Sequence, residues 1–462
     1  FTGASGTSLP NLIPPYLAYV DPWLGETAAD NRFASVDGPE DRLPDLALGR
    51  ISARTPADVT AVVDKIMAYE TAAPAGAWQR LAVFAADTDQ DNAGNFHALS
   101  DDVRLGWLPP AYDSQTIYYR RDYFSSTAMQ AALKSAFDAD ALYLQWFGHS
   151  GQFRWGGSIA ALNILHPPGF AANDAWPFTA TYSCYTGYFI NLFSGYQSLG
   201  EVLLLTPQRG SVADLSPSGL HVGPELLAFN RGMVQAIFRQ RMERVGQAAD
   251  AARGYFYTTS GGAYDLIDTM VLFGDPALRL RLPAPLLAGS TLQASRDWAP
   301  PGRPITITAT LTSTAAVSTT AQLTLTLPAE LGDPTALSAT SSNVLYDPVR
   351  RQVTWNGVVT TGTSEVVRFR SAFVPDVAAC SQATVAGQVR DGLHASTALA
   401  VTVQPATPDV DCDGGVDVAD VQQVAARWGA GLGDPAYHPR YDLDGDDQIG
   451  VLDLVIVASH WQ

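Results

Sequence analysis

The sequence predicts a chain of several domains: an α/β domain with a mostly parallel sheet over residues 1–283, an all-β domain over 284–405, and a small module over 406–462. Three observations support this fold class. Apolar runs alternate with helical patterns in the first region, Thr- and Val-rich segments alternate at period two in the second, and an acidic motif occurs twice in the third. A chain of 462 residues is also too long for a single hydrophobic core.

Short apolar runs in the first region predict buried strands, each followed by loop residues. They lie at 43–51, 80–87, 138–150 and 176–184. Residues 55–70 show a helix pattern in which Thr55 offers an N-cap and Pro56 takes the first position. A second helix pattern begins at Thr127. Strands that alternate with helices imply crossover connections and a mostly parallel sheet.

The second region contains β-strand patterns and no helix pattern. Segments that alternate at period two lie at 305–314, 321–329, 350–359, 364–374 and 396–404. Turn residues separate these segments. This arrangement predicts an antiparallel β-sandwich of the immunoglobulin-like type.

Charge and composition exclude several classes of function. The net charge is −18, from 46 acidic and 28 basic residues, and such a field repels nucleic acid and anionic lipid. No apolar run approaches the roughly 20 residues that span a bilayer, so we expect no membrane helix. Lysine is scarce while Gly, Pro, Ser and Thr are plentiful, which favours an extracellular protein.

The third region repeats an acidic loop at an offset of 33 residues. Carboxylates fall at positions 1, 3, 5, 9 and 12 of an EF-type loop in the first copy and at 1, 3, 5 and 12 in the second. They are Asp409, Asp411, Asp413, Asp417 and Asp420, then Asp442, Asp444, Asp446 and Asp453. Alternating carboxylates on a tight turn suit Ca²⁺, so we expect two calcium sites and no organic cofactor. The alternative is a pair of acidic surface turns.

Each loop precedes one helix, and this duplicated arrangement resembles the dockerin module, which docks onto cohesin domains in extracellular bacterial and archaeal assemblies. The resemblance implies calcium-dependent folding and a cohesin-type or surface partner. The partner-contacting positions would be Val418, Ala419, Val451 and Leu452. These residues are small and apolar, which also suits a module packed on its own chain. The second loop departs from the usual pattern, since Asp447 stands where Gly is common.

Two residues that follow predicted strands could form a nucleophilic site. The three cysteines, Cys184, Cys380 and Cys412, lie far apart, so one disulfide at most can form. Cys184 ends one apolar run and His149 ends another, 35 residues earlier, a spacing of about one crossover helix with its loops. If the two strands are neighbours, both side chains meet at the carboxyl edge of the sheet. His149 could then generate the thiolate.

The amides of Ser150 and Cys184 could form an oxyanion hole in such a site. The alternative is a buried structural cysteine and a loop histidine. Four other histidines lie in loops bordered by Pro or Gly, where a solvated or capping role is expected: His166, His221, His394 and His438.

The motifs around this pair resemble those of gingipain-type cysteine peptidases. Gly148-His149 is followed by Trp155, and the strand that ends at Cys184 is followed by Gly187-Tyr188-Phe189. Stretches at 44–70, 198–204 and 272–280 agree in order and spacing, so the resemblance covers residues 16–282. It implies a caspase-like fold and hydrolysis of peptide bonds in a protein substrate by a Cys–His dyad.

The resemblance also implies individual roles. Cys184 would be the nucleophile, His149 the general acid–base and Asp87 the acid that supports the histidine. Asp101 would bind a basic P1 side chain, and Trp155 would line the same pocket. Ser150 departs from the family, which usually has Gly after the histidine.

The family's first subdomain begins with strands and helices that this chain lacks, so we expect the N-terminal part to be missing or held as an upstream fragment of the same precursor. Together these features predict an extracellular or cell-surface cysteine endopeptidase of bacterial or archaeal type, tethered by a calcium module. Two alternatives remain open. The chain could be a catalytically silent structural subunit of an extracellular assembly, or a transpeptidase that sorts proteins to the surface.

Overall fold

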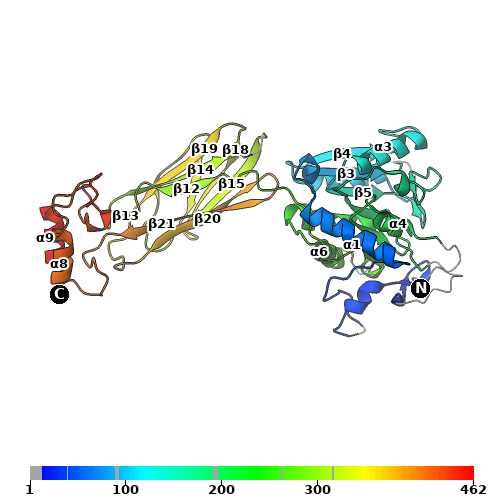
Figure 1. Ribbon diagram of the computed structural model, residues 1–462, viewed down its shortest axis with the longest axis horizontal. Helices are drawn as coiled ribbons and strands as arrows, with labels where there is room; N and C mark the ends of the chain where they lie inside the picture. Colours follow the sequence, from blue (N-terminus) through cyan, green and yellow to red (C-terminus); the bar gives the residue numbers. More distant parts are fainter. Residues whose placement is uncertain are drawn as a thin grey trace. The chain divides into compact units, whose positions relative to one another are not determined.

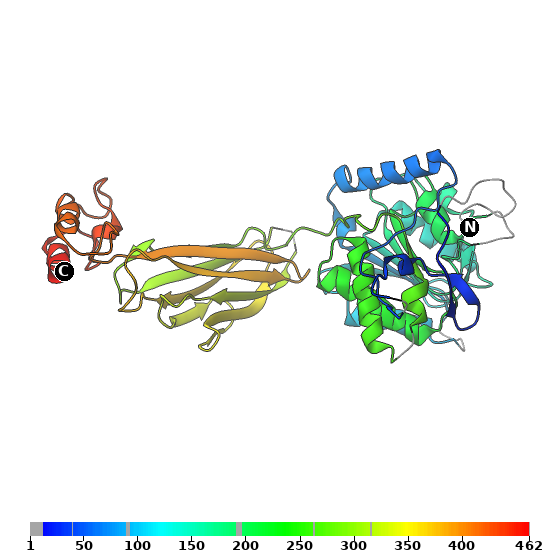
Figure 2. The ribbon, with the colours of Figure 1, turned by 90° about the horizontal axis from the view of Figure 1, so that it is seen from below.

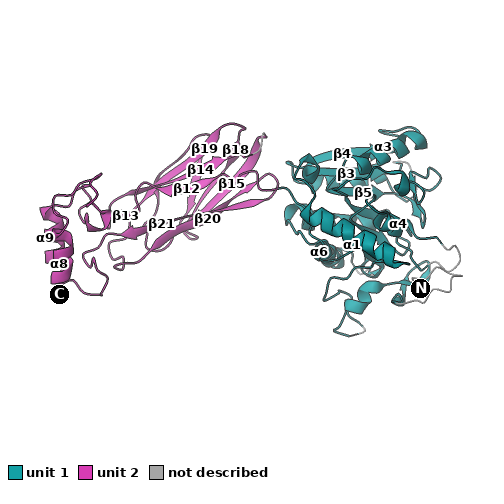
Figure 3. Ribbon diagram, viewed as in Figure 1, with its two compact units in different colours: residues 1–283 teal, residues 284–462 magenta. Residues whose placement is uncertain are grey.

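A computed structural model describes residues 13–38, 40–88, 93–190, 196–261, 264–314 and 317–461. The chain divides into two compact units, Phe1–Pro283 and Ala284–Gln462 (Figure 3). Within the described ranges, no helix has both the length and the apolar character that a membrane crossing requires.

Six strands form the central sheet of the first unit, in the order β11-β10-β9-β5-β3-β4 (Figure 1). Their bounds are β3 Leu81–Ala86, β4 Asp113–Tyr118, β5 Tyr143–Phe147, β9 Phe178–Tyr182, β10 Ala213–Pro217 and β11 Met270–Phe273. Neighbouring strands are parallel except β10 and β11. The predicted α/β fold with a mostly parallel sheet is therefore confirmed.

Helices cover both faces of this sheet. They are α1 Pro56–Thr71, α2 Phe96–Gly106, α3 Ser126–Asp138, α4 Leu199–Leu205, α5 Gly223–Val234, α6 Val245–Thr259 and α7 Asp265–Thr269. Trp146 of β5 packs in one core with Leu133 of α3 and Leu203 of α4. On the opposite face Phe147 packs on Phe96 of α2, with 6.1 Å between ring centroids. The sheet is thus buried on both sides, as expected for parallel strands.

One predicted helix boundary shifts and one predicted strand is wrong. Helix α1 begins as expected at Pro56 behind the Thr55 cap, whereas α3 is capped by Ser125, two residues before Thr127. Residues 43–51 form no strand beyond an isolated bridge from Arg50 to Phe273. Leu46 is 68% exposed, so this apolar run lies along the surface instead of entering the sheet.

The connection from β5 to β9 also differs from the expected crossover helix. It consists of a three-stranded antiparallel sheet and a short 3-10 turn at Pro167–Gly169. The strands are β6 Ser150–Gly151, β7 Arg154–Trp155 and β8 Leu162–Asn163. A second small sheet pairs β1 Leu17–Asp21 with β2 Gly25–Ala28.

Two β-sheets pack together in the second unit. Their orders are β12-β14-β19-β16 and β13-β21-β20-β15-β18-β17. The strands are β12 Thr291–Ala294, β13 Trp298–Ala299, β14 Ile305–Thr312, β15 Thr319–Thr326, β16 Thr335–Ala339, β17 Val344–Asp347, β18 Gln352–Val359, β19 Ser364–Ser371, β20 Ala383–Asp391 and β21 Ser396–Pro405. Ile307 of the first sheet and Leu323 of the second share one core, and the long β20–β21 hairpin runs along the sandwich (Figure 2).

Two helices follow the sandwich in the same unit, α8 Val418–Ala425 and α9 Val451–Ser459. Val424 and Val457 bury into a small core of their own. A disulfide joins Cys380 to Cys412, with Cα atoms 5.8 Å apart. The immunoglobulin-like and dockerin-like identities of these parts, and a boundary near residue 405, stay predictions.

The turn after β9 directs the chain away from the sheet within three residues. Tyr185 adopts a left-handed backbone with φ 61°, which costs a non-glycine residue about 1–2 kcal/mol. Its amide donates to the Gly219 carbonyl oxygen at 3.0 Å, and the Gly187 amide donates to that of Pro217 at 2.8 Å. A Cβ atom at Gly187 would lie 2.5 Å from the Ser216 carbonyl oxygen. The turn therefore requires glycine at this position because main chain lies against it.

We expect Gly187→Ala to lower the free energy of unfolding of the first unit by about 1–3 kcal/mol, the usual cost of overpacking. Gly151→Ala is the matched control, because no atom lies within 4 Å of a Cβ added there. Urea unfolding followed by tryptophan fluorescence measures both. Equal stability of the two variants would contradict the close packing of this turn.

Candidate active site

The pairing of β5 with β9 brings the two predicted dyad residues to the same edge of the sheet. Phe147 of β5 is in register with Tyr182 of β9, and His149 and Cys184 each follow two residues later. The ladder continues past the strands, because the Gly148 amide donates to the Tyr182 carbonyl oxygen at 3.2 Å. His149 and Cys184 therefore leave the sheet on adjacent strands at its carboxyl edge, where α/β folds place their sites.

Of the three cysteines, Cys184 has the free thiol, and its side chain is half-buried. Its Sγ donates to the backbone carbonyl oxygen of His221 at 3.5 Å. Burial raises the pKa of Cys184 above that of an ordinary thiol, and the Asp21 carboxylate adds to the shift. The thiol is consequently protonated at neutral pH, and a base must remove its proton before it can act as a nucleophile.

Ser150 holds the main chain of Cys184 with its hydroxyl group. The Cys184 amide donates to Ser150 Oγ at 2.9 Å. The same hydroxyl lies 2.6 Å from Ser183 Oγ and contacts the Cys184 carbonyl oxygen. The Cys184 amide, predicted to be an oxyanion donor, is thus already hydrogen-bonded. The departure from Gly at position 150 has a direct structural effect on the predicted oxyanion hole.

His149 is fixed by its backbone and by ring packing. Its carbonyl oxygen accepts from the Trp146 indole at 3.0 Å and from the Gly156 amide at 2.8 Å. Its ring lies edge-on to Phe96 of α2, with 5.3 Å between ring centroids. The position of the imidazole therefore depends on the sheet and on one flanking helix.

Asp87 follows β3 and lies against the residue that precedes His149. It is buried, its amide donates to the Phe147 carbonyl oxygen at 3.0 Å, and its carboxylate accepts from the Thr88 amide at 2.8 Å. A Cβ atom added at Gly148 would lie 2.4 Å from Asp87 Cβ, so only glycine permits this close approach. The place of Asp87 beside Gly148 favours the prediction that its carboxylate orients His149, and this role stays a prediction.

Asp101 lies on α2, and arginines of the same chain hold its carboxylate. Arg104 and Arg121 donate to it at 2.9 and 2.8 Å, and the Tyr118 hydroxyl donates at 3.1 Å. Burial works to raise the pKa of Asp101, but these partners lower it below its ordinary value. A basic P1 side chain would have to displace one of the arginines to bind here.

Trp155 lies in the core and not on a substrate surface. It is fully buried and stacks on Trp146 with parallel rings, 5.6 Å between centroids. Its place in the core under β5 gives the predicted role in a substrate pocket no support.

His221 is buried beside the candidate nucleophile, a place in the fold that the sequence did not predict. A solvated or capping loop role was expected for it, but it is only 7% exposed, and its carbonyl oxygen contacts the Cys184 thiol. Its ring nitrogens lie 3.1 Å from Asp265 Oδ2 and 2.8 Å from Thr269 Oγ1, both on residues more than 40 positions away. The one local signal is the spacing of His221 and Glu225, which puts both near the start of α5.

The two acidic loops of the second unit have the same internal hydrogen bonds. In the first, Asp420 accepts from the amides of Val410, Asp411 and Asp417; in the second, Asp453 accepts from those of Leu443, Asp444 and Gly450. Each of these pairs is separated by 33 residues, so the repeat is structural as well as sequential.

Three carboxylates converge in each loop and would suit a cation. They are Asp409, Asp411 and Asp420, then Asp442, Asp444 and Asp453, with one oxygen from each within 4.8 Å of the others. Asp442 Oδ1 is buried without a hydrogen-bond partner. Among the other predicted ligands, Asp413 and Asp446 accept from the amides of Gly415 and Gln448, and Asp417 caps α8. Oxygen donors of this kind fit Ca²⁺.

Comparisons with known proteins address the first unit above all. Residues 2–281 match the model of Peptidase family C25. Comparison with curated proteins found no match. Among solved structures, the Arg-specific cysteine proteinase gingipain R (RGPB) is 13% identical with a TM-score of 0.48, covering 82% of this chain and 79% of that chain. The complex of Porphyromonas gingivalis RgpB pro- and mature domains is 12% identical with a TM-score of 0.46, covering 82% and 81%.

A shorter likeness falls on about a quarter of the chain. A non-cellulosomal cohesin from the hyperthermophilic archaeon Archaeoglobus fulgidus is 17% identical with a TM-score of 0.20, covering 26% of this chain and 93% of that chain. The assignment of the chain rests on the family match, which spans more than half of its length. The chain belongs to Peptidase family C25, the gingipain family of cysteine endopeptidases.

Proposed function

We propose that the chain is an extracellular cysteine endopeptidase in which Cys184 is the nucleophile and His149 the general acid–base. The observation that carries this proposal is the register of β5 and β9, which leaves both residues two positions beyond paired residues. The free thiol at Cys184 supports it, since the other two cysteines form a disulfide.

In this mechanism His149 removes the thiol proton as Sγ attacks the scissile carbonyl carbon. The tetrahedral oxyanion collapses to a thioester, and the amine leaves with the proton from His149. Water then attacks the thioester while His149 again acts as base, which yields the carboxylic acid and restores the Cys184 thiol. The amides of Ser150 and Cys184 would stabilise the oxyanion, and Asp87 would orient the imidazole.

The proposal also includes a preference for basic P1 residues. The contacts of Asp101 with arginines of the same chain oppose the binding of such a side chain. Arg104 and Arg121 both pair with its carboxylate. A substrate guanidinium at Asp101 would therefore have to displace one of these ion pairs. A probe series with Arg or a neutral residue at P1 decides whether this happens.

The second part of the proposal is a calcium module that tethers the peptidase. The convergent carboxylates and the unpartnered Asp442 Oδ1 support two calcium sites. The positions expected to contact a cohesin-type partner are accessible, since Val418, Val451 and Leu452 are each more than half exposed. Calcium would organise the two loops, and the face that carries these residues would bind the partner.

A catalytically silent structural subunit is the second candidate. Two observations favour it: the raised pKa of the Cys184 thiol and the hydrogen bond from the Cys184 amide to Ser150 Oγ. In such a subunit the peptidase scaffold would be retained without turnover.

We expect an acyloxymethyl ketone probe to form one covalent adduct, on Cys184, that is absent in Cys184→Ala. His149→Ala should lower kcat/KM by at least roughly 10³-fold, because general base catalysis and thiol activation are lost together. His460→Ala is the matched control, since His460 is exposed in the tail. No adduct on folded, calcium-loaded protein with either P1 residue would favour the silent subunit.

The pH dependence of Cys184 alkylation tests its protonation state. Only the thiolate reacts, and burial raises the thiol pKa, so the rate with iodoacetamide should rise at higher pH than in the urea-unfolded chain. Without reductant, Cys380 and Cys412 stay in their disulfide and do not react. A rate that stays constant down to pH 6 would instead reveal a preformed thiolate–imidazolium pair.

Removal of calcium should destabilise the module after residue 406. At 100 times Kd a bound ligand contributes about 2.7 kcal/mol, which chelation withdraws. Limited proteolysis in EGTA should cut this region. A cut before Cys412 releases it on reducing gels only, because the disulfide retains it otherwise, whereas a cut after Cys412, as at Arg427, releases the segment beyond the cut without reductant.

Calorimetric titration should find two Ca²⁺ per chain, and Asp444→Asn should weaken one of them at least tenfold. Asp376→Asn, an exposed change in the same unit, is the control. Unchanged titration of Asp444→Asn would contradict the second site.

A further inference from the structure

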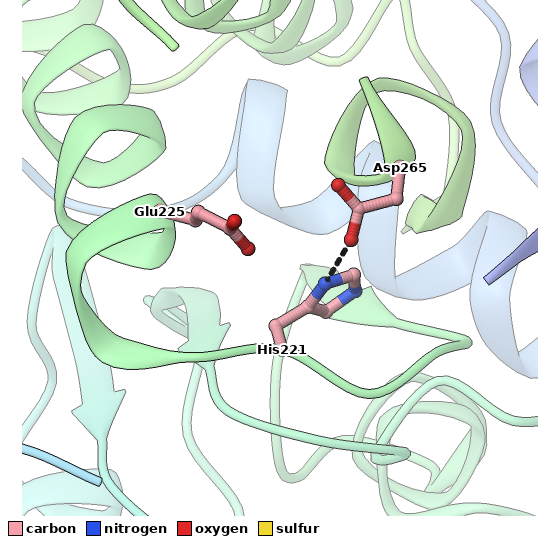
Figure 4. Close-up of side chains that lie close together, drawn as sticks. All are labelled: His221, Glu225 and Asp265. Carbon is pink, nitrogen blue, oxygen red and sulfur yellow. Dashed lines mark hydrogen bonds and ion pairs between the residues drawn. The ribbon is translucent and has the colours of Figure 1, made fainter. Parts of the chain in front are cut away.

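A second cluster of metal-ligating side chains lies next to the segment that contacts the nucleophile. His221 precedes α5, Glu225 lies in the first turn of α5, and Asp265 begins α7. One donor atom from each residue lies within 4.8 Å of the others. Figure 4 shows the three side chains directed toward one shared space, with the imidazole below the Asp265 carboxylate and the Glu225 carboxylate to one side.

The hydrogen bonds around His221 leave two acceptors facing each other. The Thr269 hydroxyl donates its single hydrogen to the Asp265 carbonyl oxygen at 2.7 Å, so its oxygen accepts from His221 Nε2 at 2.8 Å. A neutral imidazole with its hydrogen on Nε2 has a bare Nδ1. That Nδ1 faces Asp265 Oδ2 at 3.1 Å. Only a positive species shared by the two atoms makes this contact favourable.

The contact is buried, which makes the mismatch costly. The His221 side chain is fully buried and that of Asp265 is 7% exposed. Two buried acceptors that face each other lose their hydrogen bonds to water and form none in exchange, at a cost of order 1–3 kcal/mol. A cation that binds both atoms would remove this cost.

Glu225 adds a second carboxylate to the same space. Its Oε2 is buried and has no hydrogen-bond partner. In the described ranges neither Glu225 nor Asp265 forms an ion pair with Lys or Arg, whereas neighbouring Asp268 pairs with Arg32 and Arg42. Two adjacent carboxylates without a Lys or Arg partner repel each other, and this repulsion also favours a bound cation.

A cavity of about 320 Å³ adjoins the cluster and would admit an ion with a water ligand. Glu225 and Asp265 line it together with Asp268, Arg42 and residues of the β1–β2 hairpin such as Tyr19. Three protein ligands with the fourth position left to water are the usual arrangement of an open zinc site.

We propose that His221, Glu225 and Asp265 bind one divalent transition-metal ion of the zinc class. One imidazole nitrogen and two carboxylate oxygens suit Zn²⁺ or Co²⁺, whereas Ca²⁺ and Mg²⁺ prefer oxygen donors alone. Two ligands about 2.0–2.1 Å from a tetrahedral ion lie roughly 3.3 Å apart, close to the observed 3.1 Å. Thr269 on Nε2 is the outer partner that fixes the ring, as metal-bound histidines commonly have.

This site is independent of the proposed peptidase chemistry, although it adjoins it. The carbonyl oxygen of His221 accepts a hydrogen bond from the Cys184 thiol, while the ring of the same residue binds the metal. Metal occupancy would therefore fix the segment that contacts the nucleophile. The test needs no turnover, so a failed peptidase assay would not affect it.

The experiment is a Co²⁺ titration of the full chain, stripped of metal and kept in excess Ca²⁺ so that the oxygen-only loops stay filled. We expect one Co²⁺ per chain with a visible d–d band that stoichiometric Zn²⁺ removes. Glu225→Gln should weaken binding at least 100-fold without unfolding the chain, because Glu225 is partly exposed and its Oε2 has no partner to lose. Asp265→Asn should act in the same direction.

Matched controls separate this site from others on the chain. Glu243→Gln and His460→Gln alter exposed residues and should leave the Co²⁺ titration unchanged. Cys184→Ala should also retain the band, which rules out a thiolate site. Absence of a stoichiometric Co²⁺ band in the parent chain, or equal Co²⁺ affinity in Glu225→Gln, would overturn the proposal and leave His221 as an imidazolium paired with Asp265.

Discussion

The parallel ladder between β5 and β9 is the constraint on which the candidate active site depends. Side chains alternate along a strand, so a slip of one residue would send either His149 or Cys184 to the opposite face. The strand β3 beside β5 adds a third fixed position, because Asp87 lies against Gly148. The turn at Gly187 then removes the chain from the space above the thiol. No residue of the dyad depends on a long loop for its place.

Within this frame the Ser150 hydroxyl competes with substrate for the Cys184 amide. A neutral hydrogen bond of this kind contributes about 0.5–1.5 kcal/mol net. A developing oxyanion would accept a charge-assisted bond roughly twice as strong from the same amide. The transition state can therefore displace the hydroxyl, whereas a neutral ground-state carbonyl gains little by doing so. On this reasoning Ser150 lowers substrate affinity more than it lowers the rate of chemistry, and it does not by itself make the site silent.

Sequence reasoning was most successful where strand order follows from local pattern. The spacing of His149 and Cys184 suits one connection, and the two residues meet only if the β5 and β9 strands are neighbours. The sheet meets that condition, although the connection holds short strands instead of a helix. The run at 43–51 was apolar yet lies on the surface, because nothing local says which apolar run enters the sheet. Roles carried over by position could not anticipate that Arg104 and Arg121 hold Asp101. The burial of His221 depends on Asp265 and was equally out of reach.

The calcium loops show how a repeat is adapted to the chain that carries it. Each loop has two left-handed residues, at positions 4 and 6, with φ between 67° and 94°. The first loop uses Cys412 and then Gly414, and the second uses Gly445 and then Asp447. Each loop therefore has one glycine and one other residue at a left-handed position where glycine would be usual.

In both loops the non-glycine left-handed residue is the one attached to the sandwich. Cys412 is joined by the disulfide to Cys380, and Asp447 pairs with Arg296 and Arg303 at 3.5 and 3.6 Å. A left-handed residue other than glycine is strained, and the attachment offsets that strain. The substitution of Asp for Gly in the second loop, which weakens its likeness to a standard EF-type loop, is thus explained by anchoring. Calcium in either loop would consequently be coupled to the sandwich, so the proposed tether would act through the second unit as a whole.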